Sequence, residues 1–267
     1  MDVTQVFGYF AALLIGVVLG LIGGGGSILT VPVFVYLFYI NPVTATAYSL
    51  FVVGTSALFG TVKNIQKKLV DFKTGFVFAI PAFVAVYLTR KYLVPAIPES
   101  IFTINDFEVT KDIAIMVFFA IIMLLASMSM IKNRKSNEEK PSKVVAYNYP
   151  LILIEGAVVG VLTGLVGAGG GFLIIPALVL LAKLPMKKAV ATSLLIIAIK
   201  SLIGFIGDVQ NLNIDWQFLL SFTVLSVIGI FIGTYLSNFI DGKKLKKGFG
   251  YFVLIMAFYI LYKEFVS

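Results

Sequence analysis

One glycine-rich stretch occurs twice in this sequence, and the two copies lie 144 residues apart. Residues 23–27 read Gly-Gly-Gly-Gly-Ser, and residues 167–171 read Gly-Ala-Gly-Gly-Gly. The same offset aligns residues 16–72 with the second half of the chain without a gap, so that Asp71 corresponds to Asp215. Ungapped agreement over this length indicates an internal duplication. The chain is therefore expected to fold as two copies of one unit.

The composition places this duplicated unit in a membrane. Of the 267 residues, 60% are hydrophobic and 13% are charged, and the mean hydropathy is +1.02. A soluble fold of this length cannot bury that much apolar surface, so we expect an integral membrane protein. The net charge is +8 at pH 7. The basic loops lack the length and the interleaved aromatic residues of a nucleic-acid-binding surface, so we expect no nucleic-acid partner.

The chain contains no cysteine and no histidine. The usual ligands of zinc, haem and iron–sulfur clusters are thus missing, and the apolar segments hold no convincing pair of carboxylates for acid–base catalysis. We therefore expect no metal site, no cofactor, no catalytic residues and no enzymatic activity.

Apolar segments follow one another in the same order in both halves. The third, fourth and fifth segments of each half are long enough to cross a hydrocarbon core of about 30 Å, whereas the second, with about 13 residues, is too short. A glycine tract beside a short apolar segment, repeated in both halves, is typical of broken helices around a mid-membrane binding site. The sequence thus predicts an all-α polytopic membrane protein with two repeats of about five segments and broken or re-entrant helices at the glycine tracts. The segments lie near residues 6–22, 28–40, 43–62, 74–94 and 112–131, and then near 149–166, 172–184, 187–206, 216–236 and 248–265.

The charges of corresponding loops predict that the two repeats are inverted. The loop after the third segment of the first half carries four lysines between positions 63 and 73, whereas its counterpart holds Asp208 and Asp215 and no lysine. Because lysine-rich loops stay in the cytoplasm, the two loops face opposite sides. Charge does not decide whether each glycine-bearing pair of segments crosses the membrane twice or forms a re-entrant hairpin.

The same charges give an expected orientation in the cell inner (plasma) membrane. They place the polar linker, residues 132–148, in the cytoplasm and both chain termini outside. The chain then divides into a first transmembrane repeat, 1–131, and a second, 149–267.

The glycine tracts are candidates for an anion site. A glycine run in a membrane helix frees backbone groups, which must be buried in protein or line a wet cavity. Where a helix restarts after such a run, its first N–H groups and its dipole favour a small anion. The alternative is close helix packing through small residues; the duplication beside short segments favours a substrate cavity. The predicted substrate-binding residues of the tracts are Gly24, Gly25, Gly26 and Ser27, and Gly169, Gly170 and Gly171.

Lys200 is an ionisable residue deep in an apolar segment. It lies 12 residues after Lys188 and 8 before Asp208, which is about 18 Å and 12 Å along a helix. A lysine at this depth is a candidate contact for an anionic substrate or for a counter-charge. Two other roles are open, namely a side chain that snorkels to the interface and a structural ion pair with Glu155.

Three further residues complete the predicted site. Ser49 and Ser193 occupy corresponding positions in the third segments, and we expect their hydroxyls to contact substrate. Glu155 lies about two turns from the cytoplasmic end of its segment and is either a proton-coupling residue or an interfacial charge.

The glycine tracts and their surroundings resemble those of the sulfite exporter TauE/SafE family of membrane permeases, also described as toluene sulfonate uptake permeases. Residues 20–32 read Gly-Leu-Ile-Gly-Gly-Gly-Gly-Ser-Ile-Leu-Thr-Val-Pro, and residues 164–176 read Gly-Leu-Val-Gly-Ala-Gly-Gly-Gly-Phe-Leu-Ile-Ile-Pro. A further match is Lys-Ala-Val-Ala-Thr-Ser-Leu at residues 188–194. The resemblance implies transport of sulfite, organosulfonates or related small sulfur-containing anions, often outward. The chain departs from the family at Ala168 and in a long acidic loop before the fifth segment.

We therefore expect a secondary transporter, most simply an exporter, that moves a small sulfur-containing anion by alternating access of two inverted repeats. The chain has no G-x-x-x-x-G-K-[ST] motif for ATP. The alternatives are an anion channel and a membrane scaffold or assembly factor without transport. The expected partners are the anionic substrate and the lipid bilayer, and a homo-oligomer is left open.

Overall fold

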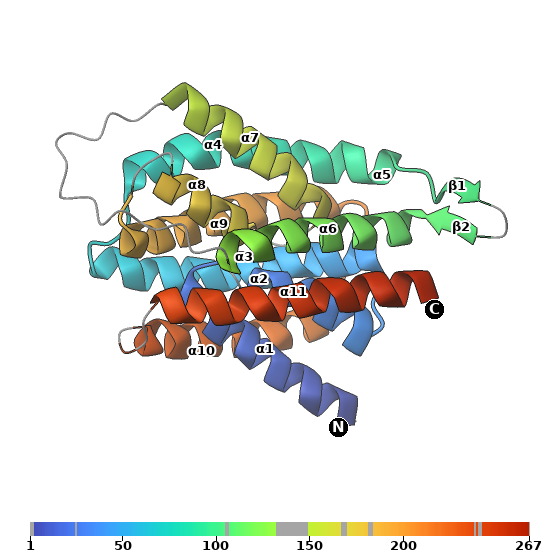
Figure 1. Ribbon diagram of the computed structural model, residues 1–267, viewed down its shortest axis with the longest axis horizontal. Coiled ribbons are helices and arrows are strands. Elements are labelled where there is room, and N and C mark those ends of the chain that lie inside the picture. The colour runs from blue at the N-terminus through green and yellow to red at the C-terminus, as the bar shows by residue number, and fades with distance from the viewer. Residues whose placement is uncertain are drawn as a thin grey trace.

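The computed structural model is almost entirely helical, and it describes residues 3–24, 26–104, 107–131, 149–166, 170–180, 184–237, 239 and 242–266 (Figure 1). The first repeat contains α1 (Val3–Ile22), α2 (Ser27–Pro32), η1 (Val33–Leu37), α3 (Pro42–Gln66), α4 (Phe72–Leu88), η2 (Thr89–Leu93), α5 (Val94–Ala96), β1 (Ser100–Ile104), β2 (Phe107–Thr110) and α6 (Lys111–Ile131). The second contains α7 (Tyr149–Val166), α8 (Gly171–Leu180), α9 (Met186–Val209), α10 (Trp216–Leu236) and α11 (Gly242–Val266). The predicted all-α class is confirmed, with one small antiparallel hairpin, β1–β2, where the sequence indicated only an acidic loop.

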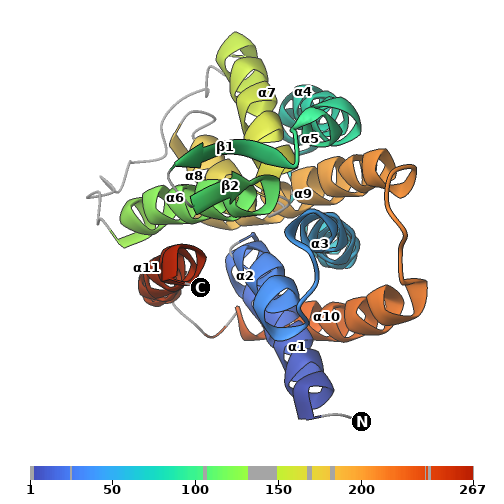
Figure 2. The ribbon, with the colours of Figure 1, turned by 90° about the vertical axis from the view of Figure 1, so that its right-hand side faces the viewer.

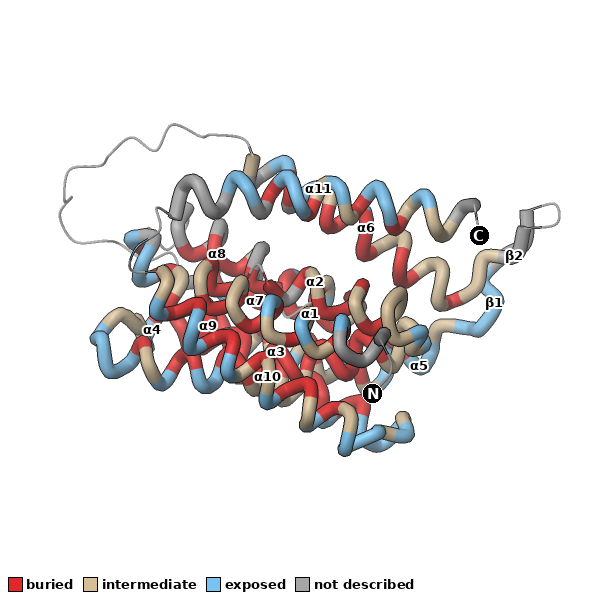
Figure 3. Tube along the Cα trace, turned by 90° about the horizontal axis from the view of Figure 1, so that it is seen from below, coloured by how far each residue is buried: buried red, intermediate tan, exposed pale blue. Residues whose placement is uncertain are grey.

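Several of the described helices are long and apolar enough to cross a membrane. The outward faces of the bundle expose large apolar side chains, such as Ile154, Val224 and Ile255, while buried residues concentrate in its middle (Figure 3). An apolar outer surface of this kind fits lipid and confirms a multi-pass membrane protein. By length and composition, four helices of the described chain qualify as membrane-crossing: Pro42–Gln66, Phe72–Ala96, Lys187–Val209 and Trp216–Leu236.

Corresponding helices begin in the same way in both repeats. The side chains of Asp71 and Asp215 cap α4 and α10, each accepting a bond from a backbone N–H of the first turn at 3.0 Å. Their own backbone N–H groups donate to hydroxyls of the other repeat, from Asp71 to Thr192 at 2.9 Å and from Asp215 to Tyr48 at 2.7 Å. Tyr48 and Thr192 are themselves 144 residues apart. The duplication therefore extends from the sequence to individual contacts.

The helices of the two repeats are interleaved. Helix α1 packs on α10 and α7 packs on α4, and these two pairs lie on opposite sides of the pair α3–α9 (Figure 2). Glycines permit both contacts, because a Cβ on Gly16 would overlap the Ser226 carbonyl, and a Cβ on Gly160 would lie 2.5 Å from the Ala82 carbonyl oxygen. Ser226 lies 144 residues after Ala82, as Gly160 does after Gly16. The remaining pair, α6 and α11, covers a third side of the bundle.

The predicted inversion of the repeats is visible where α3 meets α9. Gly54 of α3 faces Ser201 and Leu202 of α9, whereas Gly60, further along α3, faces Leu194, earlier in α9. These two helices correspond to each other in the duplication, and they run antiparallel. One repeat is therefore turned over relative to the other, about an axis that passes near the crossing of α3 and α9.

The first glycine tract interrupts a hairpin that returns to its own side. A Cβ on Gly8, near the start of α1, would overlap the ring of Phe38, just after η1, so the hairpin begins and finishes at the same end of the bundle. The 6 residues of α2 and the 5 of η1 rise at most about 16 Å, too little for a crossing. The breaks include Gly23, with φ 78°, and Gly170, with φ 70°. In the first repeat, the structure therefore shows the re-entrant form of the prediction in place of two full crossings.

The two ends of the bundle separate the loops as the charges predict. Both chain termini lie toward one end, together with the β1–β2 hairpin, and α6 ends and α7 begins toward the other (Figure 1). We call these the terminal end and the linker end. The predicted linker, 132–148, lies outside the described residues, and the division into repeats at 1–131 and 149–267 stays a prediction.

Candidate functional site

The two glycine tracts meet in the middle of the bundle. A Cβ on Gly24 would overlap the Cα of Gly171, and a Cβ on Gly171 would overlap the Cα of Gly24. The two backbones therefore touch directly, which only residues without a side chain allow. This contact is the close packing that we weighed as the alternative to a cavity, and it brings the breaks of both repeats to one point.

The two breaks differ in local conformation. Gly170 adopts a left-handed φ of 70°, and its oxygen accepts the N–H groups of Leu173 and Ile174 at 3.0 Å each in the first turn of α8. Its counterpart in the first repeat, Gly26, has a right-handed helical φ of −65°. The start of α8 is therefore built differently from the start of α2, although the two correspond in sequence.

The paired serines also differ. The hydroxyl of Ser193 donates to the Gly23 carbonyl at 2.7 Å and to that of Val190 at 2.8 Å, which ties α9 to the first tract. The hydroxyl of Ser49 is fully buried and has no hydrogen-bond partner among the described residues. Ser193 thus supports the break, while Ser49 leaves a buried hydroxyl available.

Lys200 lies at the second break. Its side chain is 0% exposed, its Nζ donates to Thr163 Oγ1 of α7 at 2.7 Å, and Nζ stands 2.7 Å from where a Cβ of Gly170 would be. The Thr163 hydroxyl in turn donates to the Val159 carbonyl at 2.7 Å. The ammonium group does not reach the surface, and in the part of the chain that the structure describes it has no carboxylate within ion-pair distance. The Lys200 amino group therefore adds a buried hydrogen-bond donor beside the N-terminus of α8, whose dipole is positive there.

The other predicted site residues lie apart from this cluster or cannot be placed. Glu155 lies on α7 two turns before Thr163, partly exposed, and its Oε2 has no hydrogen-bond partner within the described ranges. It does not pair with Lys200. Gly25 and Gly169 fall outside the described residues, and of Ser27 only its position as the first residue of α2 is described.

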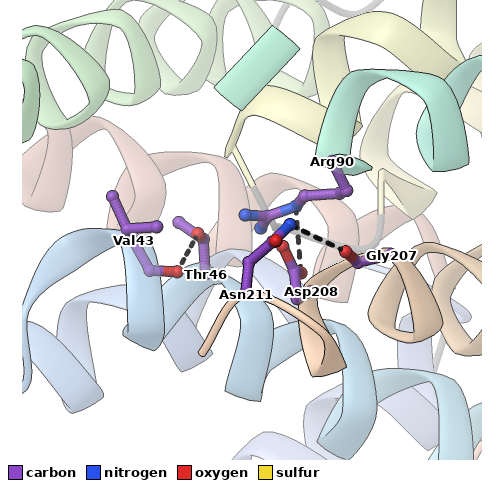
Figure 4. A network of polar contacts seen from close by, with 6 residues as sticks. All are labelled: Val43, Thr46, Arg90, Gly207, Asp208 and Asn211. Atoms are coloured by element: carbon purple, nitrogen blue, oxygen red, sulfur yellow. Dashed lines mark hydrogen bonds and ion pairs between the residues drawn. The ribbon is translucent and has the colours of Figure 1, made fainter. Parts of the chain in front are cut away.

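Two polar features were missed by the sequence reasoning. Thr163 became notable only through its bond to Lys200, because a threonine in a membrane helix usually bonds its own backbone. Arg90 carried a signal that could have been used, since it is a charged residue inside the apolar segment 74–94. It is fully buried in η2, and its Nε lies 3.5 Å from Asp208 Oδ2 of α9 (Figure 4).

A cavity of about 680 Å³ lies on the outer surface between α7 and the run α4–η2–α5, at a distance from the tract contact. It is lined mainly by apolar side chains, including Pro81, Leu88 and Val161. This lining fits lipid chains and offers no charged group to an anion. The described residues also hold no cluster of carboxylates that could bind a metal ion.

Inverted repeats whose broken helices meet inside a bundle of membrane-crossing helices define the architecture of a membrane transporter. The chain belongs to the sulfite exporter TauE/SafE family, whose model matches residues 9–260. The resemblance seen in the glycine tracts is thereby confirmed over nearly the whole length.

Relatives of the chain carry transporter names. A probable membrane transporter protein of Xylella fastidiosa is 26% identical over 258 residues, covering 95% of this chain and 94% of its own. The probable membrane transporter protein YunE of Bacillus subtilis is 30% identical over 231 residues, covering 78% of this chain and 80% of its own. A probable membrane transporter protein of Methanocaldococcus jannaschii is 38% identical over 117 residues, covering 42% of this chain and 44% of its own. No solved structure matches the chain.

Proposed function

We propose that this protein is a secondary transporter that exports a small sulfur-containing anion, such as sulfite or an organosulfonate, by alternating access of its two inverted repeats. The single observation that carries the proposal is the buried Lys200 ammonium at the break before α8. A cation held in a low-dielectric interior beside a helix N-terminus favours an anion at that point. Only the name of the family supports the choice of a sulfur-containing anion as the substrate.

The architecture supports movement of one repeat against the other. Each repeat contributes one break to the contact between Gly24 and Gly171, and each contributes one helix to the antiparallel pair α3–α9. A small shift between these elements exposes the same point to one end of the bundle or to the other. Alternating access of this kind is the usual mechanism of inverted-repeat transporters.

The proposal includes an orientation in the plasma membrane. The lysines between positions 63 and 73 follow α3 at the linker end, and the acidic hairpin lies at the terminal end. With lysine-rich loops inside, the linker, residues 132–148, is cytoplasmic and both termini are outside. Export then moves the anion from the linker end to the terminal end.

The test is transport by purified protein in liposomes, with sulfite, thiosulfate, sulfate and a short organosulfonate offered in turn. We expect saturable uptake that is stimulated by the same anion loaded inside. Lys200→Ala should lower the transport rate at least about tenfold, because it removes a charged contact to the anion. Lys188→Ala is the matched control, since Lys188 is exposed at the start of the same helix.

The outcomes separate the candidate functions. If the Lys200→Ala variant transports the anion with wild-type kinetics, Lys200 has no role in transport. Uptake without counter-flow stimulation would favour a channel, and no uptake above that of empty vesicles would favour a scaffold. Repeating the assay with a pH gradient on Glu155→Gln tests proton coupling, which we propose for Glu155 because of its unpartnered Oε2.

A further inference from the structure

Arg90 and Asp208 form a charged pair that the site around Lys200 does not include. Arg90 lies in η2, a π-helical turn of the first repeat, and Asp208 lies in the last turn of α9, in the second. Both side chains are buried, with exposures of 0% and 4%. Their positions are not duplicated, since the offset relates them to Thr234 and Asn64. This pair is therefore an addition to the symmetric scaffold.

The guanidinium group is poorly satisfied by the protein. Within the described chain, its ionic contact joins Nε to Asp208 Oδ2 at 3.5 Å, which is too long for a strong charge-assisted hydrogen bond. Nε, Nη1 and Nη2 have no hydrogen-bond partner among the described residues, and neither has Asp208 Oδ2. A purely structural Arg–carboxylate pair normally forms two short parallel bonds. An Arg with free donors in a membrane interior is instead a functional candidate.

The free end of Arg90 points at the N-terminal turns of α3. In Figure 4 the guanidinium extends from η2 toward Val43 and Thr46 and lies above Asp208. The Thr46 hydroxyl donates to the Val43 carbonyl at 2.7 Å, and Asn211 donates to the Gly207 carbonyl at 3.4 Å. These neighbours thus use their donors elsewhere. Helix α3 has 25 residues, and its N-terminal dipole adds positive potential where Arg90 points.

Arg90 also stands in line with Lys200. Asp208 follows Lys200 by 8 residues on α9, so the carboxylate beside Arg90 belongs to a residue about 12 Å from Lys200 along that helix. Lys200 lies at the meeting of the breaks, and Arg90 lies toward the terminal end of the bundle. An anion that leaves Lys200 toward the terminal end therefore meets Arg90 next.

We propose that Arg90 is a second anion-binding point on the transport path, where a small oxyanion accepts hydrogen bonds from Nη1 and Nη2 in competition with Asp208. This inference rests on the proposed function. It adds Arg90 as a second contact for the transported anion, after the contact at Lys200. Asp208 neutralises the guanidinium when no anion is bound. It also weakens anion binding there, so that the anion can be released.

The test is equilibrium binding and transport with sulfite, thiosulfate and inorganic phosphate, measured on the purified full-length protein. Asp208→Asn should bind the transported anion more tightly than wild type, with a KM lower by at least about tenfold, because it removes the competing negative charge. Arg90→Lys should raise KM by a similar factor while retaining part of the rate, since it keeps a charge and loses the fork of donors.

A further variant protects the test against misfolding. Arg90→Gln alone leaves Asp208 buried without a counter-charge and can fail to fold. The double variant Arg90→Gln with Asp208→Asn removes both charges, and we expect it to fold and to bind the anion at least about tenfold more weakly than wild type. Lys91→Ala is the matched control, because the neighbouring Lys91 donates to Tyr87 and lies over the rings of Tyr87 and Tyr92.

The results distinguish this inference from the proposed function. If wild type transports an anion and Lys200→Ala impairs it, but the Arg90 and Asp208 variants keep the wild-type KM, then Arg90 is a structural residue and the inference is wrong. If wild type neither binds nor transports any anion of the panel, both proposals fail. If only the thermal stability changes in the Asp208→Asn variant, the pair is structural as well.

Discussion

The two repeats share a scaffold and differ in chemistry. Asp71 and Asp215 cap corresponding helices with bonds of equal length, and corresponding glycines pack α1 on α10 and α7 on α4. The buried charged residues Lys200, Arg90 and Asp208, by contrast, have no charged counterpart in the other repeat. Lys200 corresponds to Ser56, whose hydroxyl donates to Ser226 at 2.8 Å. Duplication therefore accounts for the shared frame, whereas the buried charges differ between the repeats.

The comparison at the breaks is equally informative. In the second repeat, Ser193 is bonded to the first tract, and Gly170 is left-handed beside Lys200. In the first repeat, Ser49 is unpartnered within the described chain, and Gly26 is right-handed. The frame of the two breaks is thus symmetric, while the hydrogen bonds and backbone conformation at the breaks are not.

The largest effect is expected at Gly24 and Gly171, where the backbones of the two repeats touch. Gly24→Leu and Gly171→Leu each place a side chain against the opposing backbone, so each should destabilise the protein by ~3 kcal/mol or more and abolish transport. The apparent melting temperature in detergent and the liposome assay measure the two effects. Gly248→Leu is the control, because a Cβ there meets no atom within 4 Å. Wild-type stability in either tract variant would show that the breaks do not touch.

An intermediate effect is expected from the serines, which test the asymmetry directly. Ser193→Ala leaves the buried Gly23 carbonyl without that hydroxyl donor and should cost about 1–3 kcal/mol of stability. Ser49→Ala removes a hydroxyl without a partner in the described structure and should leave the melting temperature unchanged or slightly raised, while weakening any anion contact. Equal shifts in the two melting curves would contradict the difference seen between the repeats.

The smallest effect is expected from the helix caps, which test the symmetry. Asp71→Ala and Asp215→Ala should each lower stability by about 1 kcal/mol, because each removes an equivalent N-cap bond. Thermal melting of the two single variants shows whether they lose equal stability. Melting of the double variant shows whether the two losses are additive. A loss confined to one of the two positions would show that the caps are not equivalent.

Much of the fold could be predicted from the sequence, because lipid acts on the chain locally. Apolar runs mark the membrane helices, and glycine tracts beside short segments mark the broken ones. Whether a broken pair crosses twice or is re-entrant was left open by the sequence. The ends were less exact. The segment predicted at 248–265 belongs to a helix that begins at Gly242, and that predicted at 43–62 to one that continues to Gln66. Hydropathy reports the part of a helix in lipid, whereas hydrogen bonding continues into the polar flanks.

The candidate site was predicted only in part. Lys200 stood out because a charge in an apolar segment is costly wherever its partners lie. Its partner Thr163 could not be named, since a contact between α7 and α9 depends on helix packing. Arg90 was visible by the same reasoning as Lys200 and was overlooked, while its proximity to Asp208 joins residues 118 positions apart.

The sequence by itself determined that this is a helical membrane protein of two inverted repeats, each broken by glycines, because composition, duplication and loop charge are properties of the chain. Only the tertiary structure decided that the repeats interleave, that the Gly24 and Gly171 backbones touch, and that Arg90 of η2 lies beside the same helix, α9, that carries Lys200. The physical reason is that packing joins surfaces that are distant in the chain. A hydrophobic pattern says which face of a helix is buried, and it does not say against which neighbour.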